Sequence, residues 1–457
     1  MSDNKIPSDR KPVTKSSLKV RTVNKIRINT VQPKHVADPL KLFKPVRLTI
    51  PADRHERLQY MRRMFPEAAG LNLRDEFVGG RREALKRLEA LDARRYDSNR
   101  NFLNGSVSHL SPYLRHGCIS MKEVYDFVMK KFGSEAQRFI TQLAWRDFWQ
   151  HVWTKHGDAI FSDMEPAKVK LSHHGLPEDI KTAHTGLPCM DGIIQDLLND
   201  GYVHNHARMW FASYAIHWRG IDWREAADWF EAHLLDGDLA SNHLSWQWIA
   251  STFSNKPYYF NKENLSRYTG EKYCANCQVI CPFNDSYEAL KTKLFDEISA
   301  PEQRTYPTIK MVRQTPMSLT AKAVFVHDEM LSPTNPVLGE MLHRIFIFDP
   351  AFHGKWSLNR LQFVADCLAE MPDIEVWKGD TRETLQRRGV GQAISQFTPN
   401  RALKATLLPF ATNWFPKEKL TTVEISSRRL ERFSRFWQKV GPTLLGEQTD
   451  GRIKHAP

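Results

Sequence analysis

The chain has 457 residues, 41% hydrophobic and 26% charged, with a formal net charge of +13. This length predicts two or three domains with sizeable cores. No segment approaches the roughly 18 consecutive apolar residues of a membrane-spanning helix, and the N-terminal sequence MSDNKIPSDRK lacks the apolar core of a secretory signal. We therefore expect a cytoplasmic protein with no membrane partner.

The first 50 residues concentrate the positive charge. They hold twelve Lys and Arg against three Asp, which gives +9 of the total +13 and leaves +4 for the other 407 residues. A polar, basic segment of this kind predicts a flexible leader with a salt-dependent affinity for nucleic acid. A solvated tail without a ligand explains the charge equally well.

Apolar residues then recur at helical spacing through the middle of the chain. The pattern predicts helices over 52–91, 121–132, 137–152, 190–198, 204–218 and 224–235. It lapses over 301–314, a stretch with Pro and Thr that is typical of a linker. Beyond it, helical segments such as 358–371 alternate with short β-rich runs at 323–329, 344–350, 374–380 and 392–399.

These patterns predict a mainly α-helical domain followed by a small α/β domain with a parallel sheet. The expected divisions are a basic flexible leader (1–50), the helical domain (51–290), a linker (291–319) and the α/β domain (320–457). No internal repeat or long low-complexity block is apparent.

Three segments of the helical region combine residue types suited to binding. The loop SVSHLSPYLRHG (106–117) offers hydroxyls and backbone N–H groups to a phosphate, although a Ser-x-x-Ser-Pro sequence is more often a helix cap. The helix QLAWRDFWQHVW (142–153) places Gln142, Trp145 and Arg146 on one face. The third segment, 204–252, holds six tryptophans around a DGD turn, with Asn205 and Met209 one helical turn apart.

In this order, the three segments resemble the flavin-binding domain of DNA photolyases and cryptochromes, from Phe77 to Thr252. The resemblance implies a bound FAD. It also implies that Asp236 pairs with Arg208, that Asp238 faces the flavin ring and that Asn242 lies opposite the redox-active nitrogen. The implied FAD-binding residues are Tyr96, Ser108, Leu110, Ser111, Arg146, Arg208, Asp236, Asp238 and Asn242.

The same resemblance implies a face for damaged DNA, formed by Gln142, Trp145, Asn205, Met209 and Trp248. Aromatic stacking on a base contributes about 1–3 kcal/mol. Photolyases for cyclobutane dimers carry Glu at the position of Gln142. An amide donates a hydrogen bond to a pyrimidine carbonyl, but it cannot share a proton with a developing anion radical.

Trp246 and Trp223 match the first two tryptophans of the family's photoreduction chain. The third has no counterpart, because its expected neighbourhood, AKVKLSHHG (167–175), contains no tryptophan. We therefore expect electrons to reach the flavin by another path or slowly.

Three of the six cysteines lie within eight residues, Cys274, Cys277 and Cys281, which favours a metal site over disulfides. The spacing resembles the iron–sulfur branch of the family, whose fourth ligand would be Cys189. The resemblance implies a 4Fe-4S cluster held by Cys189, Cys274, Cys277 and Cys281. A zinc site with four thiolates and a set of reduced structural thiols are the alternatives.

Residues 320–450 resemble, more loosely, the antenna domain that photolyases carry at the N-terminus, so the domain order is reversed here. The sequence does not identify an antenna chromophore, and a scaffold without pigment is an equal alternative. The function implied is light-driven repair of UV-damaged DNA, a carbon–carbon lyase activity, by a monomer. The alternative is a cryptochrome-like blue-light receptor, and a third hypothesis is a light-independent iron–sulfur protein that binds nucleic acid.

Overall fold

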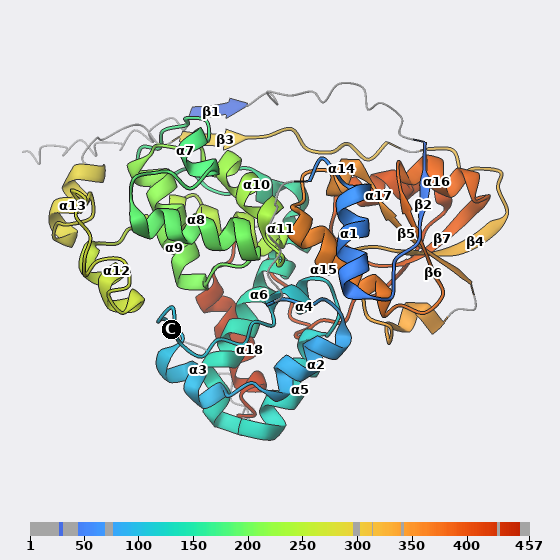
Figure 1. The fold of residues 1–457 in the computed structure, drawn as a ribbon, viewed down its shortest axis with the longest axis horizontal. Coiled ribbons are helices and arrows are strands. Elements are labelled where there is room, and N and C mark those ends of the chain that lie inside the picture. Colours follow the sequence, from blue (N-terminus) through green and yellow to red (C-terminus); the bar gives the residue numbers. More distant parts are fainter. Residues whose placement is uncertain are drawn as a thin grey trace, which may run out of the picture.

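The computed structural model describes residues 27–30, 44–68, 76–295, 302–312, 314–339, 342–426 and 430–447. A helical part and an α/β part lie side by side (Figure 1). The helical part is built from α2 (Arg81–Glu89), α3 (Ala93–Asn99), α4 (Ser111–Arg115), α5 (Met121–Phe132), α6 (Gln137–His156), α7 (Glu178–Lys181), α8 (Pro188–Asp200), α9 (Asn205–Ser213), α10 (Trp223–His233), α11 (Leu239–Ala250), α12 (Lys262–Thr269) and α13 (Tyr287–Phe295).

The predicted helical character of this region is confirmed. The helical spacing over 52–91 corresponds to two separate elements, α1 (Arg54–Met64) and α2. Pro66 lacks a backbone N–H and follows the end of α1, while Gly80, with a φ of +109°, directly precedes α2.

The α/β part contains the predicted parallel sheet, in the order β2-β6-β5-β4-β7-β8. Its parallel strands are β4 (Ala321–Val326), β5 (His343–Phe348), β6 (Ile374–Lys378), β7 (Val390–Gln396) and β8 (Asn413–Phe415), while β2 (Val46–Leu48) is antiparallel to β6. The helices of this part are α14 (Pro350–His353), α15 (Leu358–Ala369), α16 (Thr381–Arg387) and α17 (Arg401–Leu407).

The expected domain boundaries do not coincide with the packing. Strand β2 and helix α1 come before the helical part in sequence but lie with the sheet, and α1 packs on α15 (Figure 1). Arg57 of α1 donates to the buried Asp366 of α15 at 2.8 Å. Of the predicted leader, the structure describes β1 (Arg27–Thr30) and residues 44–50, and the remainder lies outside the described residues.

Two later segments also return to the helical part. Strand β3 (Glu302–Thr305), within the predicted linker, pairs in parallel with β1. Helix α18 (Phe433–Leu444) lies beside α6 (Figure 1), so the predicted α/β domain ends before it. Periodicity shows that an element exists, but not which partner covers its apolar side.

One buried arginine joins the two parts. Arg360 of α15 is fully buried and donates to the Glu231 carboxylate and to the Gly237 carbonyl, each at 2.7 Å. Its guanidinium lies 3.9 Å from the centroid of the Trp356 ring. These contacts fix α15 against the loop that follows α10, where the acidic turn lies.

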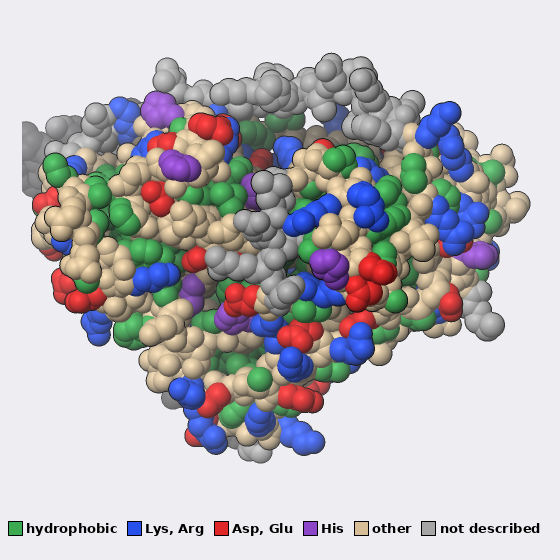
Figure 2. Space-filling model, viewed as in Figure 1, with side chains coloured by type: hydrophobic (Ala, Val, Ile, Leu, Met, Phe, Trp, Pro, Cys, Tyr) green, Lys and Arg blue, Asp and Glu red, His purple; other side chains and the backbone are tan. Residues whose placement is uncertain are grey.

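The described helices include none that is long and apolar enough to cross a membrane. On the face shown in Figure 2, basic and acidic side chains are interspersed. The described side chains on this face therefore form no continuous basic field.

Candidate functional site

The acidic turn between α10 and α11 contains two carboxylates, and each is bound by an arginine from a neighbouring helix. Asp236 accepts from Arg208 of α9 at 2.9 Å, which is the pairing that the sequence predicts. Asp238 accepts from Arg146 at 3.2 Å and from Gln150 at 2.9 Å, both on α6, and its carboxylate caps α11. The turn thus joins α6, α9 and α11.

The charge on Asp238 is strongly stabilised. Burial alone raises the pKa of a carboxyl group, but Arg146 and Arg115 outweigh burial and hold the pKa of Asp238 at about 2. The turn also requires glycine at position 237, because a Cβ there would lie 2.4 Å from Arg360 and 2.5 Å from the Glu231 carbonyl.

Several buried polar atoms around this turn have no protein partner within the described residues. They are Oδ1 of Asp236, Oγ of Ser241 and Nε2 of His204. An unpaired buried polar atom costs about 1–3 kcal/mol unless a ligand or water satisfies it. Their position beside the Arg208–Asp236 pair fits a polar ligand at the predicted flavin site.

The neighbouring Asn242 is held in place. Its side-chain amide donates to the Ala227 carbonyl at 2.9 Å, and His243 beside it contacts Asp228 at 2.9 Å. Asn242 therefore has a fixed side-chain orientation on α11, one turn of helix from the acidic turn.

The serine-rich loop precedes the short helix α4. Ser108 accepts from the Leu110 backbone N–H at 3.4 Å, and Ser111 is the first residue of α4. His109 between them has a φ of +51° and stacks on Tyr202 and on Phe77, with ring centroids 4.9 Å and 5.6 Å away. The hydroxyls of this loop thus lie on a backbone fixed by aromatic contacts.

Tyr96, another of the predicted FAD-binding residues, lies on α3. Its ring packs edge-on against Phe139 of α6 at 5.2 Å, and Arg100 lies 6.0 Å from its centroid. These contacts place Tyr96 against the helix that carries Arg146.

The predicted lesion residues come from α6, α9 and α11, and α11 contacts both of the other helices. Gln142, Trp145, Met209 and Trp248 are half-buried, and Asn205 is exposed. Trp248 packs on Tyr258 with centroids 5.7 Å apart.

One contact on this face was not anticipated from the sequence. Phe433 of α18 stacks on Trp145 with centroids 3.8 Å apart and planes at 12°. Arg432 anchors the start of α18 by binding Glu165 at 2.6 Å. One face of the Trp145 ring is therefore covered by the C-terminal helix.

The two electron-transfer candidates are both buried. Trp246 packs against Phe211 and Phe230, with centroids 6.0 Å and 5.8 Å away. Trp223, the first residue of α10, donates its indole N–H to Asp163 at 2.8 Å. Sequence reasoning missed Asp163, because a single acid 60 residues away gives no periodic signal.

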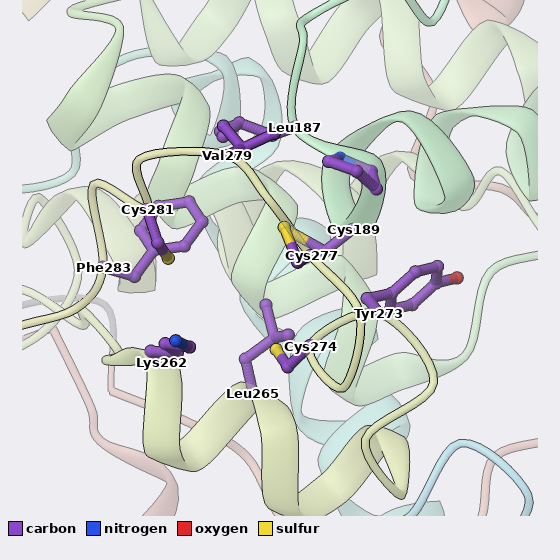
Figure 3. A pocket seen from close by; sticks show the side chains of 11 residues that line it. Leu187, Cys189, Lys262, Leu265, Tyr273, Cys274, Cys277, Val279, Cys281 and Phe283 are labelled. Carbon is purple, nitrogen blue, oxygen red and sulfur yellow. The ribbon is translucent and has the colours of Figure 1, made fainter.

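The four predicted metal ligands line one small cavity of about 30 Å³ (Figure 3). Cys189 comes from α8, and Cys274, Cys277 and Cys281 come from the loop after α12. Burial, together with the nearby Cys281 and Cys274, raises the pKa of the Cys189 thiol to about 12. Within the described residues, no group of three or more His, Cys, Asp or Glu side chains gathers around a single metal position.

A second cavity, of about 350 Å³, lies between the two parts of the molecule. It is lined by residues that follow β4 and β7, such as Asp328 and Thr398, and by Arg115 and Glu231 of the helical part. Strand order reverses at β4, and ligands of open α/β sheets commonly bind at the carboxyl ends of strands beside such a point.

Comparison with known proteins identifies a domain within the helical part. Residues 139–318 match a family described as the FAD binding domain of DNA photolyase. This range includes the acidic turn, Arg146, Arg208 and the four cysteines, but not Tyr96 or the 106–117 loop.

Individual relatives agree with this match. A deoxyribodipyrimidine photo-lyase of Streptomyces griseus is 37% identical over 157 residues, 34% of each chain. A cryptochrome DASH of Natronomonas pharaonis is 30% identical over 253 residues, 50% of this chain and 52% of the relative. The crystal structure of Synechocystis sp. PCC6803 cryptochrome is 27% identical, with a TM-score of 0.41 over 45% of this chain and 47% of that one. The chain thus spans a third to a half of the length of the curated relatives it matches.

Proposed function

We propose that this chain, whose residues 139–318 match the FAD-binding domain of DNA photolyases, is a light-driven repair enzyme for UV-damaged DNA. The observation that carries the proposal is the acidic turn, with Asp236 and Asp238 held by Arg208 and Arg146 and with an unpartnered buried oxygen on Asp236. The residues present fit FAD.

The proposed roles follow from the contacts. Asp238 and Asn242 would hydrogen-bond the ring system of FAD, and Arg146 and Arg208 would balance the charge around it. The loop residues Ser108, Leu110 and Ser111, with Tyr96, would hold the diphosphate. When bound and reduced, FAD would supply one electron to the lesion on light absorption and would recover it after bond cleavage, so that the reaction has no net redox change.

On the DNA side, an extruded pyrimidine pair would stack against Trp145 and Trp248 and meet Asn205 and Met209. Extrusion costs a few kcal/mol, and less for a base that is already damaged. Phe433 would act through Trp145 as a positioning residue, because it covers one face of the half-buried indole and so fixes its plane. Trp246 and Trp223 would carry electrons to the flavin.

Gln142 provides a direct test of the lesion site. Gln142→Glu should raise the yield of cyclobutane dimer repair by about tenfold, because a carboxyl group shares a proton with the developing anion radical and an amide does not. The measurement is illuminated repair of a dimer-containing oligonucleotide by FAD-replete protein. Gln137→Glu, an exposed change on the same helix, should leave the yield unchanged.

Equal yields for wild type, Gln142→Glu and Gln137→Glu would show that Gln142 does not face the lesion. Restoration of neither dimers nor (6-4) lesions by any of them would favour the second candidate, a cryptochrome-like photoreceptor. Two observations favour that candidate: the amide at Gln142 and the covering of one Trp145 face by Phe433.

We also propose that the four cysteines hold a 4Fe-4S cluster. A single zinc ion requires four sulfurs about 2.3 Å from one point, whereas these cysteines surround a cavity lined also by Leu265, Val279 and Phe283. Tyr273 also lines this cavity, with its hydroxyl directed away from the four cysteines (Figure 3).

We further propose that the α/β part is the counterpart of the family's antenna domain, with its position along the chain reversed. The cavity at the carboxyl ends of β4 and β7 supports this assignment. Chromatography of small molecules released from purified protein tests whether it holds a pigment: a second chromophore beside FAD supports the assignment, and FAD alone favours a scaffold without pigment.

A further inference from the structure

Among the described residues, the indole N–H of Trp223 has a single acceptor. It donates to Oδ1 of Asp163 at 2.8 Å. Trp223 is 2% exposed and Asp163 is 5% exposed. A proton that leaves this indole therefore moves to the carboxylate and not directly to water.

The other oxygen of Asp163 is also fixed. Oδ2 accepts from the backbone N–H of Arg304 at 2.7 Å, and the Asp163 carbonyl accepts from Gln303 at 2.9 Å. The guanidinium of Arg304 is bound to Asp222, so its charge is balanced beside the pair. Hydrogen bonds from β3 thus fix the orientation in which the Asp163 carboxylate faces the Trp223 indole.

Trp223 also ends the tryptophan chain that the sequence provides. If Trp246 lost an electron, Trp223 would replace it and would itself become oxidised. Residues 167–175 contain no third tryptophan that could in turn donate an electron to Trp223. If the oxidised indole keeps its positive charge, the electron returns to it quickly. Loss of the indole proton neutralises the radical and slows this return.

We propose that Asp163 is the proton acceptor for oxidised Trp223 during light-driven reduction of the flavin, an inference that rests on the proposed function. The oxidant would be light-excited oxidised FAD at the proposed site, and Trp223 would lose one electron by way of Trp246. The Nε1–H bond of Trp223 breaks and an O–H bond forms at Oδ1 of Asp163. The products are a neutral indole radical and a neutral carboxylic acid. An external thiol returns the electron, and the proton then moves back to Nε1.

The acidities of the two groups favour proton transfer from oxidised Trp223 to Asp163. An oxidised indole is a far stronger acid than a neutral one. Burial raises the pKa of Asp163 to about 6, against hydrogen bonds from Arg304 and Trp223 that lower it, so the group is a carboxylate at pH 8 and an acid at pH 5. The titratable and charged groups facing the pair are His173, Asp222, Arg224, His243, Arg304 and Tyr306.

Transient absorption of the FAD-bound protein after a light flash tests the step. At pH 8 the wild type should form the deprotonated tryptophan radical, and Asp163→Asn should form only the protonated radical, with a lifetime shorter by roughly an order of magnitude. Asp179→Asn, which removes a carboxylate paired with Arg219, is the matched control and should behave as the wild type. Wild type should lose the deprotonated radical as the pH falls through about 6.

A second readout needs neither light nor flavin. In protein labelled with ¹⁵N-tryptophan, the Trp223 indole resonance should shift with an apparent pKa near 6, and Asp163→Asn should abolish that shift. Identical radical spectra and lifetimes in Asp163→Asn and wild type, or an indole resonance that does not titrate, would overturn the inference. Protein without flavin absorption would contradict the proposed function instead, and the resonance would then decide the inference.

Discussion

Asp238→Ala protein is expected to purify with less than about a tenth of the FAD of the wild type. Asp238 accepts from Arg146 and Gln150 and caps α11. Removing one member of a buried ion pair destabilises a protein by about 3–5 kcal/mol, because the remaining charge is left without compensation. The same change removes the carboxylate proposed to face the flavin ring.

Flavin absorbance per polypeptide and the thermal midpoint measure the two effects separately. Asp238→Asn keeps a helix cap but loses the charge, so we expect it to retain the fold and bind FAD weakly. Asp126→Ala breaks only an exposed pair with Lys122 and should change neither quantity, since such pairs contribute about 0–1 kcal/mol. Full flavin occupancy in Asp238→Ala would show that the acidic turn is not the flavin site.

Cys277→Ser is expected to remove bound iron and the broad visible absorption of a cluster, and to lower the thermal midpoint. The metal cross-links α8 to the loop after α12 in this proposal, and binding energy of this kind becomes folding energy. The pKa of the Cys189 thiol, about 12 without metal, means that loading at neutral pH releases a proton. Occupancy should therefore fall as the pH is lowered.

Elemental analysis of protein purified without oxygen decides the metal. About four iron atoms per chain in the wild type, and none in Cys277→Ser, is the result that a 4Fe-4S cluster requires. Cys118→Ala, at a buried cysteine that contacts Cys367 and not the cavity, should keep its iron. Finding one zinc per chain would indicate a tetrahedral zinc site in place of the cluster. Finding neither iron nor zinc would indicate reduced structural thiols.

The sequence anticipated elements whose signals are local. Helix α5 has the predicted bounds, since a capping box at Ser120 and Glu123 begins it and Gly133 ends it. The Arg208–Asp236 pair was predicted through the family resemblance and is present at 2.9 Å. Each of these features depends on residues close in sequence or on a motif that the family carries.

Contacts between distant segments could not be predicted. Phe433 lies 288 positions after Trp145, and nothing in its apolar helix α18 indicates whether α6 or the sheet covers it. For the same reason β2 was assigned to the leader: three residues bury little surface alone, and the strand depends on pairing with β6. Asp163 was missed because its acceptor role depends on one hydrogen bond to Trp223.

The most direct test of the proposed function is illumination of FAD-replete, reduced protein with oligonucleotides that carry either a cyclobutane dimer or a (6-4) lesion. Intact pyrimidines are counted by chromatography in light and in matched darkness. We expect one of the two lesions to be restored in the light and neither in the dark. Restoration of neither lesion by protein that carries stoichiometric FAD would contradict the repair function.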